Sequence, residues 1–526
     1  MKLLYLCLTF SCYLLWSPFN TFGQSVGHVD HAFGEKGFVS LDEDASPEDP
    51  HCLGTQADGK ILVAGKVYKD DRESLFISRL FEDGSVDLDF GYNGRVDLGI
   101  EGEIRDIQAP NLRHIYLTGH ITTSKKDKDF LLIRLNIDGS IDKDFASQGR
   151  KILNLGGTDE AFSLTFQEDG KLLLAGNTYA QSWIQRDFAI VRLEPNGTID
   201  WGFGNGGIKR IDVGKYDSFQ DLIVQEDGKI LVCGYTKPER FTKFAVFRLD
   251  TDGNPDPRFD GDGIKIMDIG VENAFCEGMV LDKDQNILLM GHTRRNQYAR
   301  GFDFVVLKLF PNGMFDRGYG NEGSGISYID LGGTEYATGM HIQQDGNLLL
   351  MGTSNHKVTV VRINEHGKLD KSFGTNGQLT NDNFKLGREK LYDFTIQDNH
   401  KILLAGMADE APFVSRVHGN PDIMGLEEIL MSPWEGGLSK SKKYASLSLS
   451  NDFSFNVWLE GEHYPDAKGL YLSQGSGAEA ILPIRAFAAE RAYLQIGQNC
   501  KLTALWDTED NLHIYLNGKY AYTFSD

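Results

Sequence analysis

Acidic side chains are the most regular group in this sequence that could do chemistry. Four of them stand just before apolar segments with the pattern of strands: Asp159, Asp217, Glu272 and Glu335. If these segments surround an axis, the four carboxylates would ring one mouth of a central channel and attract a cation or a basic ligand. The alternative is that each carboxylate accepts hydrogen bonds from backbone N–H groups of its own connecting loop.

A second acidic group has the spacing Asp-x-Asp-Gly-x-x-Asp and comprises Asp250, Asp252 and Asp256. Carboxylate oxygens are hard ligands that suit Ca²⁺. The stretch lacks the downstream glutamate of an EF-hand loop, however, and it lies at a turn that recurs elsewhere without these acids. Turn chemistry is therefore the favoured interpretation, and we expect no metal site here.

The familiar catalytic signatures are missing from the sequence. It contains no nucleophile elbow, no His-Glu-x-x-His, no Cys-x-x-Cys and no phosphate-binding glycine loop. The 13 histidines are scattered. Four widely spaced cysteines follow residue 23, namely Cys52, Cys233, Cys276 and Cys500, and we expect them to be buried thiols. We therefore predict no catalytic residue, no cofactor and no metal.

One cationic position recurs at even intervals along the chain. It is occupied by Arg79, Arg134, Arg192, Arg248, Lys308, Arg362 and Arg416. In the first six cases an aspartate follows eight residues later. Such fixed spacing indicates a structural ion pair or an Asx-turn contact, with arginine favoured for its planar fork.

Those aspartates open the clearest marker of an internal repeat, Asp-x-x-Phe-Gly-x-x-Gly. The marker begins at Asp30, Asp87, Asp142, Asp200, Asp256, Asp316 and Asp370, in steps of 54 to 60 residues. The aromatic residue of the marker is Phe in six of the seven copies and Tyr319 in the copy that begins at Asp316. The last glycine of the marker stands at 37, 94, 149, 207, 263, 323 and 377. We expect the aromatic ring to fill the gap between neighbouring repeats.

Between markers, Asp-Gly joins two apolar runs, as in the segment 56–65. This dipeptide predicts a hairpin with a type I′ turn. The runs that follow are continuously apolar, which predicts strands buried on both faces: 61–64, 172–175, 348–351 and 402–405. Each repeat then yields four short strands, and seven such repeats predict an all-β, seven-bladed β-propeller.

The phase of the repeat predicts how the ring closes. The last repeat ends with residues 413–417 and lacks a fourth strand, whereas residues 37–41 form a fourth strand with no blade before it. We expect 37–41 to complete blade seven, because closure removes exposed sheet edges.

These markers resemble the delta-60 repeat family of secreted bacterial proteins over about residues 30–420. The resemblance implies a propeller fold and an extracellular setting, but it carries no agreed activity.

The two ends of the chain differ from the repeats. Lys2 and the apolar run 3–16 predict a signal peptide over 1–23, and the run is too short for a permanent span, so we expect no transmembrane helix in the mature chain. The propeller would occupy 24–420 and a linker 421–440. Residues 441–526 resemble part of a laminin G-like domain through the strand 447–458 and the Asn-Gly hairpin 512–520, and they end before the final strands of such a domain. That resemblance implies a glycan- or protein-binding β-sandwich.

Composition narrows the range of partners. The net charge of −22 disfavours nucleic acid, whose binding needs cationic patches. We expect a monomeric, secreted or cell-surface binding or scaffold protein that presents its loops to a protein or a glycan. The alternative is a carbohydrate-active enzyme, a glycosidase or lyase, with its site in the propeller channel. A glycosidase needs two carboxylates facing each other across a pocket, and no such pair stands out in the sequence.

Overall fold

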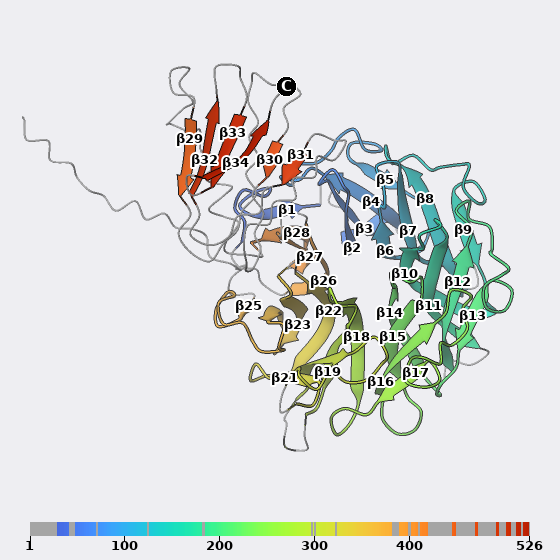
Figure 1. Cartoon of the computed structure of the whole chain (residues 1–526). Coiled ribbons are helices and arrows are strands. Elements are labelled where there is room, and N and C mark those ends of the chain that lie inside the picture. Colours follow the sequence, from blue (N-terminus) through green and yellow to red (C-terminus); the bar gives the residue numbers. More distant parts are fainter. Residues whose placement is uncertain are drawn as a thin grey trace, which may run out of the picture.

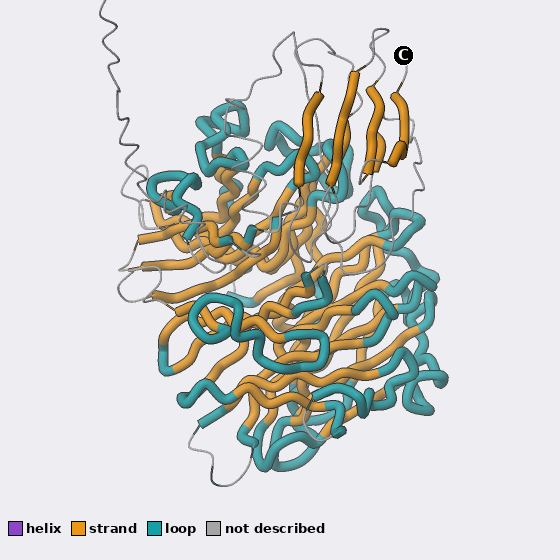
Figure 2. Tube along the Cα trace, turned by 60° about the vertical axis from the view of Figure 1, so that its left-hand side comes forward, coloured by secondary structure: helices purple, strands orange, loops and turns teal. Residues whose placement is uncertain are grey.

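The protein is described by a computed structural model (Figure 1). It describes residues 29–41, 48–69, 72–123, 126–180, 185–295, 298, 301–320, 323–343, 345–380, 389–397, 401–408 and 411–418, together with six strands between 444 and 524. All described elements are strands or loops (Figure 2). The described residues include no helix of the length and apolar character needed to cross a bilayer.

Seven four-stranded antiparallel sheets form the blades of a β-propeller, as predicted. Blade one comprises β2 (Glu48–Thr55), β3 (Ile61–Lys69), β4 (Arg72–Leu80) and β5 (Arg95–Asp97). Blade two comprises β6 (Gly102–Gln108), β7 (His114–Thr122), β8 (Lys128–Asn136) and β9 (Arg150–Leu153). Blade three comprises β10 (Gly157–Phe166), β11 (Leu172–Ala180), β12 (Arg186–Leu193) and β13 (Ile208–Ile211).

Blade four comprises β14 (Asp217–Val224), β15 (Ile230–Thr236), β16 (Lys243–Leu249) and β17 (Ile264–Met267). Blade five comprises β18 (Ala274–Leu281), β19 (Ile287–Thr293), β20 (Asp303–Leu309) and β21 (Ile326–Ile329). Blade six comprises β22 (Glu335–Ile342), β23 (Leu348–Ser354), β24 (Lys357–Ile363) and β25 (Gln378–Thr380). The first strand of each blade lies innermost, around the common axis (Figure 1).

Blade seven is built from both ends of the repeat region. Its strands are β26 (Glu389–Ile396), β27 (Ile402–Ala408), β28 (Ala411–Val417) and β1 (Phe38–Ser40). β1 pairs with β28 in the register Phe38 to Ser415, which confirms the predicted closure of the ring.

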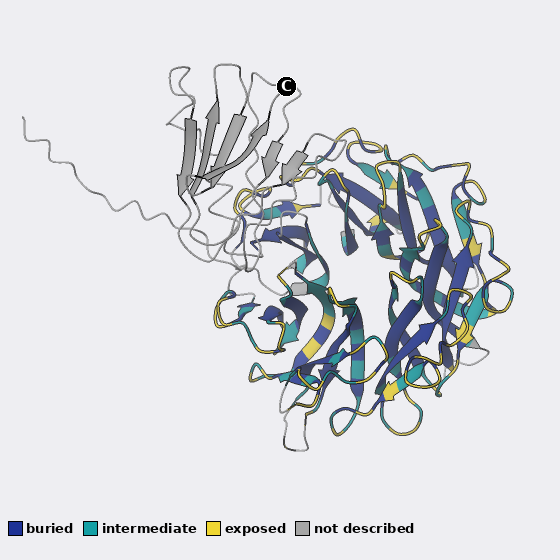
Figure 3. Ribbon diagram, viewed as in Figure 1, coloured by how far each residue is buried: buried dark blue, intermediate teal, exposed yellow. Residues whose placement is uncertain are grey.

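The apolar core lies between the blades rather than within one of them. Seven separate clusters of buried side chains occur, one for each pair of neighbouring blades. Figure 3 shows the corresponding pattern, with buried strands facing each other across every junction. A blade therefore buries its two faces only against its neighbours, and burial of this apolar surface is the main driving force for assembly.

The Asp-Gly hairpins form, but their turn type differs from the expectation. In the first hairpin Gly59 has a φ of +82°, whereas Asp58 is not in the left-handed region. Gly59 N donates to Gln56 O, and Gln56 N donates to Lys60 O. This pattern is a type I turn followed by a glycine bulge, so only the glycine needs a positive φ.

An arginine latch joins the third strand of a blade to its own marker and to the next blade. Arg79 Nε lies 2.8 Å from Asp87 Oδ2, its guanidinium lies 4.5 Å from the centroid of Phe90, and it donates to the carbonyl of Ile137 in blade two. The same ion pair recurs at Arg134–Asp142, Arg192–Asp200, Arg248–Asp256, Arg362–Asp370 and Arg416–Asp30. In blade five Lys308 replaces the arginine, and its Nζ lies 3.9 Å from Asp316.

The predicted marker glycine of the sixth copy needs a correction. Lys308 N donates to the carbonyl of Gly325, as Arg79 N donates to that of Gly94. Gly325, with a φ of +79°, therefore takes the place that the sequence pattern assigned to Gly323. Extra residues in this copy shift the glycine along the chain.

The C-terminal strands are β29 (Tyr444–Ser448), β30 (Gly469–Tyr471), β31 (Arg491–Tyr493), β32 (Lys501–Trp506), β33 (Leu512–Leu516) and β34 (Lys519–Phe524). Four of them form an antiparallel sheet in the order β29-β32-β33-β34, and β30 pairs with β31 in parallel. The pairing of Leu516 with Lys519 gives the predicted hairpin. The predicted linker 421–440 and most of strand 447–458 lie outside the described residues.

We predict that the substitution Asp30→Ala opens the ring. Asp30 is buried, and its carboxylate forms ion pairs with Arg416 and Lys401 of blade seven, where the two ends of the repeat region meet. Removing one partner of a buried ion pair costs about 3–5 kcal/mol, so the midpoint of urea unfolding should fall strongly. Lys126→Ala removes an exposed ion pair with Glu101 and serves as the control, for which the midpoint should stay unchanged. Equal midpoints for the two variants would contradict this role of Asp30.

Candidate functional site

The two ends of the propeller axis carry different kinds of residues. We call one end the turn face; it holds the Asp-Gly hairpins, the turns between third and fourth strands, and the arginine latches. The opposite end is the connection face, formed by the loops between second and third strands and by the links from blade to blade. The repeated residues lie on the turn face, so candidates for a specific function are found on the connection face.

Every innermost strand has a β-bulge at the same place near its start. We call the seven bulged residues the axial ring: His51, Arg105, Phe162, Gln220, Glu277, Thr338 and Tyr392. Bulges commonly re-aim side chains next to functional sites. Seven copies of one backbone position thus carry seven different residue types, in contrast to the uniform latch positions.

A charged network occupies the axial ring at blades one and two. His51 lies 3.2 Å from Asp49 and 3.5 Å from Glu103, and Arg105 lies 2.8 Å from Glu103. The ring of Tyr392 from blade seven contacts His51 in a tilted arrangement, with the ring centroids 4.9 Å apart. Burial, followed by a hydrogen bond to Asp49, raises the pKa of Tyr392 well above its usual value. Within this network the side chain of Arg105 is 39% exposed, and its guanidinium group could contact an acidic group from solvent.

Glu277 and His292 form a neutral acid–base pair at blade five. Burial raises the pKa of Glu277 to about 8 and lowers that of His292 to about 4. Glu277 Oε1 lies 3.8 Å from His292 Nδ1. That nitrogen also accepts a hydrogen bond from Ala337 N at 3.3 Å, which leaves the ring proton on Nε2. Glu277 is therefore protonated at pH 7 and able to donate a proton.

Three aspartates lie one residue after the bulge and link innermost strands of neighbouring blades. Leu164 N donates to Asp106 Oδ2 at 2.8 Å, Met279 N to Asp221 Oδ2 at 3.2 Å, and Leu53 N to Asp393 Oδ2 at 2.8 Å. Burial raises the pKa to about 6 for Asp106 and to about 7 for both Asp221 and Asp393. These carboxyl groups therefore link the innermost strands of blades two and three, of blades four and five, and of blades seven and one.

Aromatic residues line the connection face at blades four to six. The rings of Tyr235 and Phe275 lie 5.1 Å apart, and Phe275 stacks on His292 at 5.0 Å. The series continues with Phe302 and Tyr336, whose centroids are 5.6 Å apart. This side of the face thus differs from the charged side at blades one and two.

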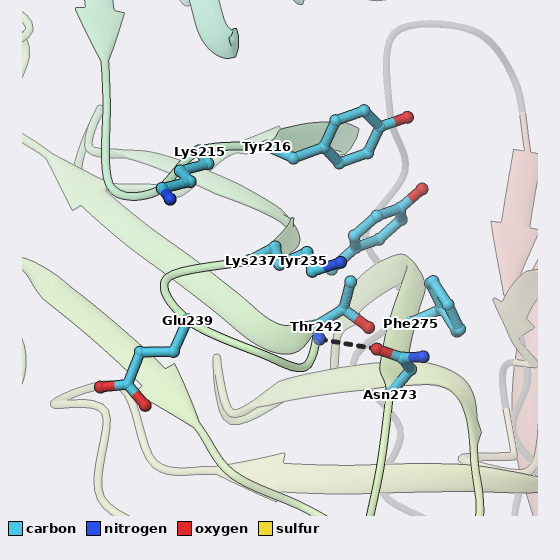
Figure 4. Close-up of a pocket in the computed structure, with 8 residues that line it drawn as sticks. All are labelled: Lys215, Tyr216, Tyr235, Lys237, Glu239, Thr242, Asn273 and Phe275. Atoms are coloured by element: carbon cyan, nitrogen blue, oxygen red, sulfur yellow. Dashed lines mark hydrogen bonds between the residues drawn. The ribbon is translucent and has the colours of Figure 1, made fainter. Parts of the chain in front are cut away.

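A pocket of about 540 Å³ opens between blades four and five within this aromatic series. Its lining is Lys215, Tyr216, Tyr235, Lys237, Glu239, Thr242, Asn273 and Phe275. Figure 4 shows the rings of Tyr216 and Tyr235 side by side, with their hydroxyl groups pointing the same way. The buried hydroxyl of Thr242 has no hydrogen-bond partner among the residues that the structure describes, while Thr242 N donates to Asn273 Oδ1 at 3.0 Å. Flat apolar rings with a few placed polar groups are typical of a ligand pocket.

The four acids predicted to ring a channel mouth do not share one environment. Asp159, Asp217 and Glu335 occupy equivalent positions at the start of β10, β14 and β22, and all three are fully buried. Each accepts a backbone N–H from its connecting loop, from Leu155, Val213 and Gly333 respectively. Their attraction for a cation stays a prediction.

Glu272 lies outside this set. In blade four, Asp217 pairs with Thr236, which lies two residues after Gly234 on β15. In blade five, Ala274 pairs with Thr293, which lies two residues after Gly291 on β19. Ala274 is therefore the residue of blade five that is equivalent to Asp217. Glu272 instead accepts Arg294 Nη1 at 3.0 Å through both carboxylate oxygens. The loop before β18 therefore shifts the acid out of the column that the sequence spacing indicated.

The group around Asp250 behaves as turn chemistry. Asp250 Oδ1 accepts the backbone N–H groups of Asp252 at 3.0 Å and of Asn254 at 2.8 Å. Asp256 forms the arginine latch with Arg248. These contacts occupy the carboxylates in the way that other copies of the turn do.

Sequence reasoning missed the axial ring and the pocket. A bulged residue is out of register with its neighbours, so alternation of apolar and polar residues does not reveal where its side chain points. One signal was present in the sequence, since the residue just before Cys52, Asp106 and their equivalents has a different type in each of the seven blades.

We predict that the three inner aspartates make the protein less stable as pH rises. Their pKa is raised in the folded state above the 3.8 of the unfolded chain, so their contribution is complete at low pH and is lost as pH passes through about 6 to 7. Between pH 5 and 8 the free energy of unfolding should fall by at least about 1.4 kcal/mol, the equivalent of one pKa unit.

Urea titrations at several pH values test this expectation. The triple variant Asp106→Asn, Asp221→Asn, Asp393→Asn should show a smaller fall, whereas Asp252→Asn on the turn face should behave like the unsubstituted protein. An equal fall in the triple variant would show that other groups cause the pH dependence.

Comparison with known families gives one match. Residues 56–90, 167–203 and 225–259 match a family described as a domain of unknown function (DUF5122) beta-propeller. The three segments lie in blades one, three and four, and each runs from the Asp-Gly hairpin to the marker phenylalanine. Among curated proteins no sequence matches the chain.

Solved structures resemble the chain loosely. Polysaccharide lyase Uly1 has a TM-score of 0.44 at 11% identity, covering 76% of this chain and 98% of its own. Drosophila semaphorin 1a, extracellular domains 1–2, has 0.41 at 8% identity, covering 74% and 89%. A prolyl endopeptidase has 0.38 at 9% identity, covering 69%, and this chain spans 46% of its length. The architecture described above depends on the strand pairing alone.

Proposed function

We propose that this protein is an extracellular or cell-surface binding protein that takes up an acidic glycan on the connection face. The pocket between blades four and five carries the proposal, because it combines aromatic faces with two lysines. A sugar ring presents an apolar C–H face that stacks on an aromatic ring, while its hydroxyl groups need hydrogen-bond partners.

The aromatic residues supply the stacking surface. Tyr216, Tyr235 and Phe275 are all partly exposed, and Tyr235 lies next to Phe275. Tyrosine combines an apolar ring with a polar tip, which suits a ligand that is itself amphipathic. Thr242, with its unpartnered buried hydroxyl, and Asn273 provide polar contacts at the floor.

The two lysines favour an acidic sugar over a neutral one. Lys215 and Lys237 are exposed, and neither ammonium group lies within 4.0 Å of a carboxylate in the described residues. Two uncompensated cations in a pocket are unusual on a chain with a net charge of −22. A uronate or sulfate group would complement them, with Glu239 restricting the orientation of the ligand.

Two features of the sequence agree with this proposal. The segment 1–23 has the composition of a signal peptide, and the resemblance to delta-60 repeat proteins implies an extracellular setting. The region 441–526, with its resemblance to a laminin G-like domain, would add a second glycan- or protein-binding module. The antiparallel strands β29, β32, β33 and β34 are consistent with such a module.

We predict that Tyr235→Ala and Phe275→Ala each weaken binding of an acidic oligosaccharide at least about tenfold, because each removes part of the stacking surface. A glycan array with acidic and neutral members selects the ligand, and calorimetry on the full chain measures the dissociation constant. Lys215→Ala and Lys237→Ala should lower affinity for acidic members and leave neutral ones unchanged.

Trp201→Ala is the matched control. Trp201 is 74% exposed on the turn face, so its removal should not alter binding. If Trp201→Ala weakens binding as much as Tyr235→Ala, or if neutral glycans bind best, the pocket is not the recognition site.

A second candidate function is a carbohydrate-active enzyme acting at the axial ring. The observation that favours it is the neutral carboxyl group of Glu277, with a pKa of about 8, on the same ring as His51, Arg105 and Tyr392. A lyase needs a base, an acid and a cation for the sugar carboxylate, and a glycosidase needs an acid and a second carboxylate. Both sets of residue types are present around the axis.

For this second candidate we predict that polysaccharide cleavage, measured as new reducing or unsaturated ends, falls at least about 100-fold in Glu277→Gln, because glutamine cannot donate the proton. Asp252→Asn on the turn face is the control. Full activity in Glu277→Gln, or an absence of cleavage by the unsubstituted chain across acidic and neutral polysaccharides, would reject the enzymatic role.

A further inference from the structure

We propose that two junctions between blades bind Ca²⁺, one between blades three and four and the other between blades five and six. The first site consists of Asp187, Asp212 and Asp217, and the second of Asp303, Asp330 and Glu335. In each site one carboxylate oxygen from every residue lies within 4.8 Å of the other two. This inference is independent of the glycan pocket.

The two sites are built from the same three backbone positions. The first acid stands on the third strand of a blade, the second follows the fourth strand, and the third opens the first strand of the next blade. At both sites the first and third acids are buried and the second is exposed. An ion could therefore enter from solvent and be held by two buried ligands.

Each cluster contains a buried carboxylate oxygen that has no hydrogen-bond partner in the described residues. At the second site Glu335 Oε1 accepts hydrogen bonds from Gly333 N at 3.1 Å and Ser354 Oγ at 2.8 Å, whereas Oε2 is buried and has no partner in the described part of the chain. At the first site Asp187 Oδ1 is likewise buried and without a hydrogen-bond partner in the described residues, and Asp187 is 6% exposed. Buried polar atoms are nearly always paired, and the binding of an ion is one reason for an exception.

In the described residues none of these six acids forms an ion pair with a side-chain cation within 4.0 Å. The guanidinium groups of Arg210 and Arg295 act electrostatically on Asp187 and Asp303 respectively, but from beyond ion-pair distance. Each cluster thus concentrates negative charge near neutral pH that a divalent cation would offset.

Equivalent junctions elsewhere in the ring show how the same positions are satisfied without an ion. Between blades two and three the middle residue is Asn154, whose Nδ2 donates to Asp129 Oδ1 at 2.7 Å. Between blades four and five the first residue is Lys243, whose Nζ lies 2.8 Å from Asp268 Oδ2. Only where all three residues are acids does a buried oxygen at these positions stay unpaired in the described residues.

The ligand type suits Ca²⁺, and the separation of the carboxylate oxygens, within 4.8 Å of one another, accommodates it. Ca²⁺ binds carboxylate oxygens at 2.3–2.6 Å, so two ligands on opposite sides lie up to about 5 Å apart. Mg²⁺ needs shorter bonds of 2.0–2.1 Å and a strict octahedron. Three carboxylates, supplemented by water on the exposed side, would supply the six to eight oxygens that Ca²⁺ takes.

The junction with Asn154 suggests a decisive experiment on the full chain. Asp212→Asn and Asp330→Asn each place an amide at the middle position of the junction, where Asn154 stands between blades two and three. Each substitution should therefore remove one bound Ca²⁺, and the double variant should remove two. Conversely, Asn154→Asp should create a third three-acid junction and add one Ca²⁺. Stoichiometry is measured by calorimetry with CaCl₂ on chelator-treated protein, and MgCl₂ provides the comparison.

Thermal unfolding gives a second readout that also controls for folding. In EDTA, Asp212→Asn and Asp330→Asn should melt at a higher temperature than the unsubstituted chain, because the amide pairs with the buried acid. With CaCl₂ the unsubstituted chain should gain stability and the double variant should not. Equal Ca²⁺ stoichiometry in the unsubstituted chain and the double variant, no Ca²⁺ binding, or an equal response to MgCl₂ would overturn the proposal.

Discussion

The whole molecule depends on the fact that a single blade cannot bury its own apolar faces. Both faces of each four-stranded sheet are apolar, and the core consists of clusters shared between neighbours. The arginine latch adds direction to this burial, because one guanidinium pairs with its own marker aspartate, covers the marker ring and reaches a carbonyl of the next blade. The last latch, Arg416 with Asp30, joins the two ends of the repeat region and converts an open stack into a ring.

This construction separates the work of stability from the work of recognition. The turn face repeats the same residues because each latch must meet the same neighbour. The connection face carries no latch, so its residues can differ from blade to blade without opening a junction. The charged network around His51 and Glu103 and the aromatic series around Tyr235 and Phe275 are two outcomes of that freedom on a single scaffold.

The sequence predicted the fold well and the site poorly, for the same physical reason. Marker spacing identifies strands because turns and buried rings need particular residues, so the blades and the closing strand 37–41 followed directly. Spacing alone misjudges positions next to loops of variable length, as Glu272 and Gly323 illustrate. The axial ring lies at bulges, where the alternation of a strand is broken, and the pocket joins loops that are far apart in the chain.

The hydrogen bonds of the axial carboxyl groups distinguish structural acids from chemical ones. Asp221 and Asp393 each accept one backbone N–H from the next blade and another from the following residue, so both of their oxygens are engaged. A group held in this way cannot approach a substrate without opening a junction. Glu277 accepts no backbone N–H in the described residues, keeps part of its surface accessible, and lies next to a neutral histidine. Compared with Asp221 and Asp393, Glu277 therefore has a carboxyl group that is less constrained and more able to take part in proton transfer.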